Sequence, residues 1–314
     1  MINKNILKAL LPQIGLLVAM VLWASSFIAL KIAFRAYDPM VVIFGRMLVA
    51  SLCLLIVGYR FRRAVTYQKG DYLLILFMAF CEPCLYFLFE AQALVYTTAS
   101  QAGMITAILP VMVMISASLI LKERTGVQGW LGALLAVAGV AWLTLESAPT
   151  ENAPNPMLGN FLEFIAMICA TGYMISLRYL TIRYSPFFLT AVQAFVGCIF
   201  YFPFLFLPST ELPRSFDLVP GLAVIYLGAA ITLGAYGLYN YGLKYIPASK
   251  AAAYVNLIPV LSVLLGWIVL GEKFERNQII AAFIIMTGVW LTQQRFAQGR
   301  AENQSVRGSF EDSA

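Results

Sequence analysis

The sequence predicts an all-α integral membrane protein with ten transmembrane helices in an inverted repeat of five plus five. Three observations lead to this prediction. Hydrophobic residues fill 61% of the 314 positions and charged residues only 11%, whereas a soluble domain carries about 25% charged residues. Apolar runs of membrane-crossing length follow one another along the chain, and two distant stretches of equal length open alike and close alike.

Ten apolar runs are long enough to be transmembrane helices. About 20 residues cross a bilayer, and the backbone of a chain in lipid must form its hydrogen bonds internally. The first run is too long for the apolar core of a signal peptide, which favours an uncleaved anchor. The runs lie at about 10–34, 39–58, 71–92, 98–121, 127–146, 157–180, 186–207, 217–241, 247–270 and 275–294.

The placement of lysine and arginine predicts the orientation. Of the 21 such residues, 15 lie on the side of the two termini, five on the opposite side, and Arg46 inside a span. Positive charge favours the cytoplasmic side, so both termini are predicted to be cytoplasmic in a multi-pass protein of the cell (inner or cytoplasmic) membrane. Residues 148–156 contain no lysine or arginine and are predicted to be an external linker, and residues 297–314 form a polar cytoplasmic tail.

Two stretches indicate an internal repeat. Positions 99–110 read ASQAGMITAILP and positions 248–259 read ASKAAAYVNLIP. The same offset of 149 residues pairs Glu123 with Glu272, and an offset of 147 residues relates earlier positions. Residues 1–147 and 157–296 are therefore predicted to be two copies of one unit. Because each copy has five helices, the second is inverted relative to the first, as in many secondary transporters.

Both halves also resemble EamA-type units of the drug/metabolite transporter superfamily. The first half carries LWASSFIALKIAFRAYDPMVVIFGRMLVASL and the AQALVYTTASQAGMITAILP stretch, and the second carries NYGLKYIPASKAAAYVNLIP followed by LGEKF. The resemblance implies a ten-helix transporter that moves small metabolites, often outward. The third span, FCEPCLYFLFEAQAL, departs from the family because it contains two acids where many members are apolar.

The third and second spans contain ionisable residues at membrane depth. Glu82, Tyr86 and Glu90 are spaced by four residues, which places them on one face of a helix. A charge near the bilayer centre costs roughly 2.5–3.5 kcal/mol on insertion scales, so such groups mark cavities or ion pairs. Arg46 can hold a substrate carboxylate or pair with Glu82, and Gln193 is its counterpart in the second half.

Other polar residues are candidates to line a substrate site. They are Trp23 in the first span, Tyr236 and Asn240 in the eighth, and Tyr254 and Asn256 in the ninth. The competing interpretations are helix–helix hydrogen bonding and an interfacial aromatic belt. Pro110 and Pro259 occupy matching positions in the two halves, and they are predicted to kink the fourth and ninth helices as paired hinges.

The composition argues against several other functions. The chain has no histidine, and its five cysteines lie in apolar runs, which gives no support for a metal site, a cofactor or a disulfide framework. The scattered basic residues do not suggest nucleic acid. The sequence thus favours a secondary transporter that exports an amino acid or related organic solute. Two roles stay open for Glu82: it carries a coupling proton, or it forms a permanent structural pair with Arg46. A membrane sensor or scaffold and an intramembrane enzyme remain the alternatives, and the protein is expected to be a monomer or homodimer in the lipid bilayer.

Overall fold

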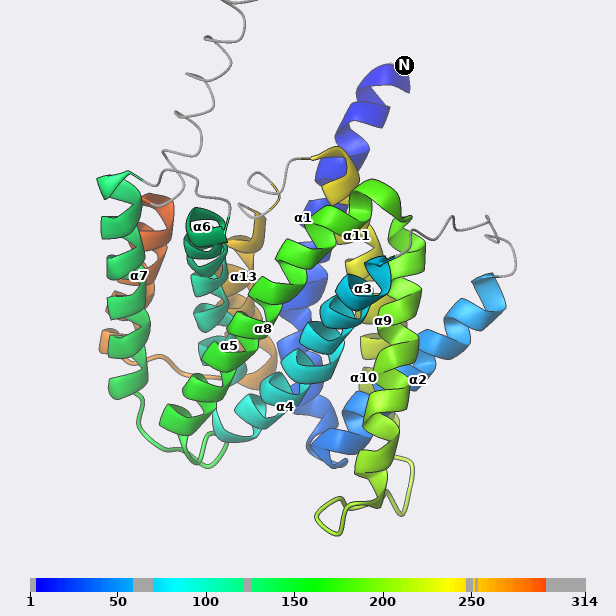
Figure 1. Ribbon diagram of the computed structural model, residues 1–314. Coiled ribbons are helices and arrows are strands. Elements are labelled where there is room, and N and C mark those ends of the chain that lie inside the picture. Colours follow the sequence, from blue (N-terminus) through cyan, green and yellow to red (C-terminus); the bar gives the residue numbers. More distant parts are fainter. Residues whose placement is uncertain (1–3, 59–69, 121–125, 247–250, 252–253, 292–314) are drawn as a thin grey trace, which may run out of the picture.

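The computed structural model describes residues 4–58, 70–120, 126–246, 251 and 254–291 (Figure 1). Within these ranges the regular structure is helical apart from one isolated bridge between Thr150 and Ala153. The prediction of an all-α protein is therefore confirmed. The α-helices are α1 (Lys4–Ala33), α2 (Pro39–Gly58), α3 (Asp71–Ala79), α4 (Tyr86–Tyr96), α5 (Ala99–Ile105), α6 (Leu109–Ile120), α7 (Val127–Leu145), α8 (Pro156–Arg183), α9 (Pro186–Tyr201), α10 (Leu218–Tyr226), α11 (Tyr236–Tyr245) and α13 (Leu257–Leu265).

Eight helical stretches in the described residues are long and apolar enough to cross a membrane. They are Leu10–Ala33, Pro39–Ile56, Asp71–Tyr96, Ala99–Ser116, Val127–Leu145, Pro156–Arg183, Pro186–Phe206 and Leu218–Tyr245. Two shorter apolar helices, Leu257–Leu270 and Arg276–Leu291, lie where the ninth and tenth spans are predicted. Arg276–Leu291 ends directly before residues outside the described ranges. The chain is a multi-pass membrane protein.

The surface of the bundle is apolar, and several charged groups are buried inside it. Large aliphatic and aromatic side chains are exposed on the outside, among them Ile56, Leu134, Ile182, Ile199 and Phe283. Such a surface is stable in lipid, whereas water would drive it to aggregate. The buried polar set includes one arginine and three glutamates, Arg46, Glu82, Glu90 and Glu163.

The third span is not one continuous helix. Residues Phe80–Leu85 form an irregular wide turn, η2, between α3 and α4. Glu82 has the extended backbone angles φ −149° and ψ 116°, and the peptide that joins it to Pro83 is cis. Pro83 cannot donate a helical hydrogen bond. The sequence predicts an uninterrupted helix here, so the prediction is wrong for this segment.

Side chains of α9 satisfy the backbone carbonyl groups that this interruption leaves free. Gln193 donates from Nε2 to the Glu82 carbonyl oxygen at 3.0 Å. The Tyr201 hydroxyl lies 3.2 Å from the Pro83 carbonyl oxygen and also donates to that of Cys84. Non-helical backbone at membrane depth is tolerated only where protein groups pair with it, and α9 provides that pairing.

A second irregular segment occupies a related position in the other half. Residues Leu227–Ala235 form the wide-turned segment η5 between α10 and α11. An offset of 149 residues carries residues 80–85 of η2 to 229–234, which lie within η5. The third and eighth spans thus both depart from α-helical geometry at matching positions, but only the third is broken by a residue with extended backbone angles.

The packing of these spans brings the two halves of the chain together. Helix α1 packs against α10, η5, α11 and α13, α2 packs along α9 and η5, and α4 packs along α8 (Figure 1). Gly228 in η5 permits a close approach to α2, because a Cβ atom there would lie 2.7 Å from the Arg46 carbonyl oxygen. The interior between α1, α2, α4, α8 and α11 therefore draws on both halves.

Candidate functional site

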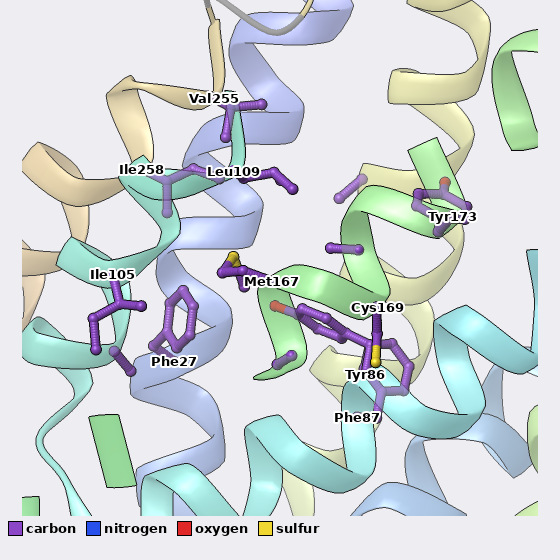
Figure 2. Close-up of a cluster of buried hydrophobic side chains, with 14 of the residues drawn as sticks. Phe27, Tyr86, Phe87, Ile105, Leu109, Met167, Cys169, Tyr173, Val255 and Ile258 are labelled. Carbon is purple, nitrogen blue, oxygen red and sulfur yellow. The ribbon is translucent and has the colours of Figure 1, made fainter. Parts of the chain in front are cut away.

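A small cavity lies in this interior. The space open to the centre of a water molecule measures about 50 Å³, enough for about three to five waters at 10–15 Å³ each. Figure 2 shows part of its apolar wall, with Phe27 of α1, Tyr86 of α4 and Met167 of α8. The lining residues are Trp23, Ser26, Phe27, Arg46, Glu82, Tyr86, Glu90, Thr106, Leu109, Met167, Ala170, Tyr173, Met174, Tyr236, Val255 and Ile258.

Arg46 is the cation of this cavity, and its side chain is held on three sides. The side chain is 2% exposed, and Nε donates to Thr232 Oγ1 at 2.9 Å. The guanidinium carbon lies 3.8 Å above the ring centre of Phe87, a cation–π contact that desolvation strengthens. Arg46 Nη1 forms an ion pair with Glu90 Oε2 at 3.7 Å. The sequence offers Glu82 as the partner of Arg46, whereas the structure pairs Arg46 with Glu90.

Glu90 and Tyr86 lie together on α4, as their spacing predicts. The Tyr86 hydroxyl donates to Glu90 Oε1 at 2.9 Å, and both residues are buried. Their separation of four residues places them one helical turn apart on the same face. Glu90 is thereby held between a phenol on its own helix and a guanidinium on α2.

Glu82 has a different partner because of the interruption in the third span. Its Oε1 accepts a hydrogen bond from the Tyr236 hydroxyl of α11. Glu82 therefore contacts the second half of the chain, and its carboxyl group is 4% exposed in the structure. The predicted single face of Glu82, Tyr86 and Glu90 does not form, since Glu82 has extended backbone angles, yet all three residues line the cavity.

Aromatic rings surround these polar groups. Trp23 contacts Tyr236 and Tyr239, with ring centres 5.2 and 4.8 Å apart. Tyr173 of α8 meets Tyr236 at 6.2 Å between ring centres. The result is a cavity whose wall combines aromatic faces with carboxyl groups and one guanidinium.

Three atoms of the lining are buried without a hydrogen-bond partner among the described residues: Trp23 Nε1, Arg46 Nη1 and Glu90 Oε2. A buried donor or acceptor that is left unpaired costs about 1–3 kcal/mol, and more when the group is charged. Arg46 Nη1 and Glu90 Oε2 face each other as the 3.7 Å ion pair, which is longer than a hydrogen bond, and Trp23 Nε1 is a neutral donor in the same lining. Together they are able to bind a ligand that carries both an acidic and a basic group.

Four of the predicted site residues do not line the cavity. Asn240 connects two helices, since its Nδ2 donates to Thr190 Oγ1 at 2.9 Å and its Oδ1 accepts from Tyr173 at 3.3 Å. Gln193 supports the backbone of the third span. Tyr254 and Asn256 are half-buried on the chain that leads into α13, where Val255 and Ile258 provide the lining instead.

The two prolines lie next to interruptions in their helices. Residues Thr106–Ile108 form a tight 3₁₀ turn, η3, and α6 begins at Leu109, directly before Pro110. A turn at Asn256 precedes α13, which begins at Leu257 and includes Pro259. Each proline thus lies in the first turn of a new helical segment, where its missing donor is tolerated.

We expect the double replacement of Pro110 and Pro259 by alanine to slow transport while the protein still inserts. Alanine restores a backbone donor and favours a continuous helix at both sites. The measurement is uptake by proteoliposomes at equal protein content, with Pro149→Ala in the 146–155 connection as the matched control. Uptake equal to that of the wild type in the double variant excludes the hinge role.

One buried acid in the interior is absent from the sequence-based candidates. Glu163 of α8 is 0% exposed, and neither carboxyl oxygen has a hydrogen-bond partner among the described residues. It interacts electrostatically with Glu90 of α4. The signal was available in the sequence, because Glu163 is a lone acid within the apolar run of the sixth span.

Comparison with known proteins indicates a family for the whole chain. The model of the EamA-like transporter family matches residues 10–145 and again residues 157–293. An uncharacterized transporter of Bacillus subtilis, YetK, is 24% identical over 91% of this chain and 87% of its own length. An uncharacterized transporter of Archaeoglobus fulgidus is 27% identical over 88% of this chain and 95% of its own length. One crystal structure of a protein shares the fold, with a TM-score of 0.62 and 19% identity over 90% of this chain and 98% of that chain.

Proposed function

Because this chain belongs to the EamA-like transporter family, we propose that it exports a small zwitterionic solute, an amino acid or a related compound, in exchange for protons. The observation that supports this proposal is a cavity lined by the Arg46–Glu90 ion pair, which is 3.7 Å long and has no hydrogen bond between these atoms, and by a Trp23 N–H group without a partner among the described residues. Arg46 Nη1 can donate to a substrate carboxylate, and Glu90 Oε2 can accept from a substrate ammonium group. Trp23 Nε1 adds a neutral donor.

The proposed mechanism is alternating access between two inverted halves of five helices each. Two observations support it: the family model matches the chain twice, and the third and eighth spans both depart from α-helical geometry at matching positions. Substrates of transporters built from inverted repeats bind near the midplane at the repeat interface, which is where residues of both halves meet around Arg46.

Contacts between distant segments close the bundle at both ends. At one end, the Glu272 carboxylate accepts from the backbone N–H groups of Ala99 and Ser100 at 2.9 and 3.0 Å. At the other end, Asp71 accepts from Arg183 Nη1 at 2.7 Å and from the Tyr184 hydroxyl at 3.0 Å. The small volume of the cavity agrees with a conformation that is closed on both sides, in which a solute of amino-acid size does not fit. Opening one end requires one of these contact sets to break.

Proteoliposome flux tests the proposed function. Vesicles that contain the purified protein are loaded with the standard amino acids, radiolabelled and mixed, and a pH difference is imposed across the membrane. Exchange for protons predicts that label moves toward the acidic compartment and that dissipating the pH difference stops this movement. The mixture is then divided to identify the substrate.

The same assay separates the alternatives. A sensor or scaffold moves no label under either condition. An intramembrane enzyme converts the solute chemically, which chromatography of the vesicle contents detects. Movement of label that is independent of the pH difference contradicts proton coupling but still supports a transporter. Absence of movement for the mixture contradicts an amino-acid substrate.

We also propose that both termini are cytoplasmic. Single cysteines at Glu151, in the connection between α7 and α8, and at Ser309 in the tail should react with an impermeant reagent from opposite sides of the membrane, since the lysine and arginine distribution places the tail inside. The protein without added cysteines measures the background from its five native thiols. Labelling of both positions from the same side overturns the orientation.

A further inference from the structure

The buried carboxyl group of Glu163 lies outside the cavity and has no role in the binding of the solute described above. It does not line the cavity, and its two oxygen atoms have no hydrogen-bond partner among the described residues. An isolated carboxylate in an apolar environment is strongly disfavoured and becomes neutral by taking up a proton. A glutamate inside a membrane span is a functional candidate by default.

The groups around Glu163 offer no opposite charge. Two residues of α4, Glu90 and Tyr86, interact electrostatically with the Glu163 carboxyl group. The segments η3, Thr106–Ile108, and α6 contain no titratable residue, and α3 carries Asp71 and Tyr72 at the far end of its span. Arg46 of α2 is already paired with Glu90. Among the described residues, one interior guanidinium therefore balances one of three buried glutamates, and Glu163 is the one whose carboxyl oxygens have no hydrogen-bond partner.

A cluster of polar side chains lies between Glu163 and one end of the bundle. Asn160 precedes Glu163 by three residues on α8, which places both on one side of the helix. Its Oδ1 accepts from Thr97 Oγ1 at 2.6 Å, and its Nδ2 donates to Gln101 Oε1 at 3.2 Å and approaches Thr144 Oγ1 at 3.4 Å. Thr97 Oγ1 also lies 2.9 Å from Gln101 Oε1. Thr97 belongs to the short connection between α4 and α5, at the end of the bundle.

We propose that Glu163 is a proton-binding site, and that Thr97, Gln101 and Asn160 form the path by which its proton exchanges with the solution when the α4–α5 end of the bundle opens, since these three residues are 0, 5 and 1% exposed in the structure. Hydrogen-bonded hydroxyl and amide groups conduct protons together with transient water, whereas an apolar contact between α4 and α8 does not. This inference rests on the proposed function for its role, because exchange requires the proton and the solute to be bound in turn. A proton from solution binds a Glu163 oxygen while the solute is absent, and the same proton returns to the solution along the path when the solute binds.

Infrared spectroscopy tests the proposal without any transported solute. The carbonyl stretch of a protonated carboxyl group is resolved from that of a carboxylate and shifts when the proton is replaced by deuterium. At neutral pH, we expect Glu163→Gln to remove one protonated-carboxyl band that Glu82→Gln leaves in place. The exposed Glu151→Gln variant, in the connection between α7 and α8, is the control and should remove none.

The path is tested by the rate at which that band shifts after transfer to deuterium oxide. In the triple variant Thr97→Val, Gln101→Leu and Asn160→Leu, the band should remain but its shift should slow roughly tenfold or more, as expected when hydrogen-bonded steps are lost. Thr287→Val, which removes a hydroxyl from the last helix, is the control for the rate. If the triple variant does not accumulate, Asn160→Leu alone carries the same test.

Two results overturn the inference: an unchanged carboxyl spectrum in Glu163→Gln, and an unchanged exchange rate in the path variants. Should Glu163→Gln fail to fold, Glu163→Asp serves instead, since it keeps the acid and should shift the band rather than remove it. These outcomes are independent of the flux assay. A wild-type protein that moves no amino acid contradicts the proposed function and leaves the infrared result standing.

Discussion

Replacing Arg46 with methionine is expected to lower the free energy of unfolding by about 3–5 kcal/mol, the cost of removing one partner of a buried ion pair. The variant should also lose solute binding. Arg46 and Glu90 are 2% and 3% exposed in their side chains, so water cannot compensate for the lost charge. The loss includes the hydrogen bond to Thr232 and the contact with Phe87. Thermal unfolding in detergent and proteoliposome uptake are the two measurements.

Matched variants separate the charge of Arg46 from its shape. Arg35→Met removes an exposed arginine at the end of α1 and should change neither measurement. Arg46→Met combined with Glu90→Gln removes both charges and should recover most of the stability but none of the uptake. Arg46→Lys keeps the charge but loses the planar guanidinium that matches a carboxylate and stacks on a ring, so uptake should fall with a smaller loss of stability. An Arg46→Met protein as stable as the wild type contradicts the buried pair.

The sequence predicts the spans well because the thickness of the lipid bilayer sets their length. A bilayer requires about 20 apolar residues for each helix, and this requirement is visible in any single chain. The first eight predicted spans agree with the structure within a few residues at most ends. Larger differences fall at the end of the third span, which runs on to Tyr96, at the end of the fourth, which stops at Ser116, and at the end of the eighth, which runs on to Tyr245.

The contacts inside the bundle were less predictable, because sequence does not give the rotation of each helix about its axis. The spacing of Glu82, Tyr86 and Glu90 suggests one face, but Pro83 interrupts the helix and directs Glu82 toward Tyr236. Pro83 itself was the available signal, since proline inside a helix removes a donor and disturbs the preceding turn. The partner of Arg46 then follows from the packing of α2 against α4, which no local pattern encodes.

Polar residues inside the membrane also divided between two roles that look alike in sequence. Asn240 and Gln193 satisfy other buried polar groups, and Trp23 and Tyr236 line the cavity. All four are single polar or aromatic residues in apolar runs. A polar side chain either forms a hydrogen bond with a neighbouring helix or remains available to a ligand. Which of the two occurs depends on the three-dimensional arrangement of the helices.

The three buried glutamates differ in their partners, and this difference should separate their functions. Glu90 is paired with Arg46, Glu82 accepts from the neutral Tyr236, and Glu163 has no partner among the described residues. Neutralising Glu90 therefore leaves a buried cation uncompensated, and Glu90→Gln should destabilise the protein. Neutralising Glu82 leaves no such charge. The two conservative variants should behave in opposite ways.

Glu82→Gln is expected to give a folded protein that has lost pH-driven uptake but still exchanges labelled solute for unlabelled solute. The amide oxygen of glutamine can still accept from Tyr236, so the contact between the third span and α11 is kept. What glutamine cannot do is take up and release a proton as the cavity opens to each side in turn. Exchange requires no net proton movement and should survive, whereas concentrative uptake should not.

Tyr236→Phe is the matched control, because it removes the hydrogen bond that Glu82→Gln keeps, and it leaves the Glu82 carboxyl group able to titrate. If Glu82 carries the proton, Tyr236→Phe should retain pH-driven uptake with a shifted pH profile. If the hydrogen bond alone matters, Tyr236→Phe should be the more severe variant, since Glu82→Gln preserves that bond. Unchanged pH-driven uptake in Glu82→Gln would exclude the carrier role and leave Glu90 and Glu163 as the two carboxyl groups able to couple the solute to protons.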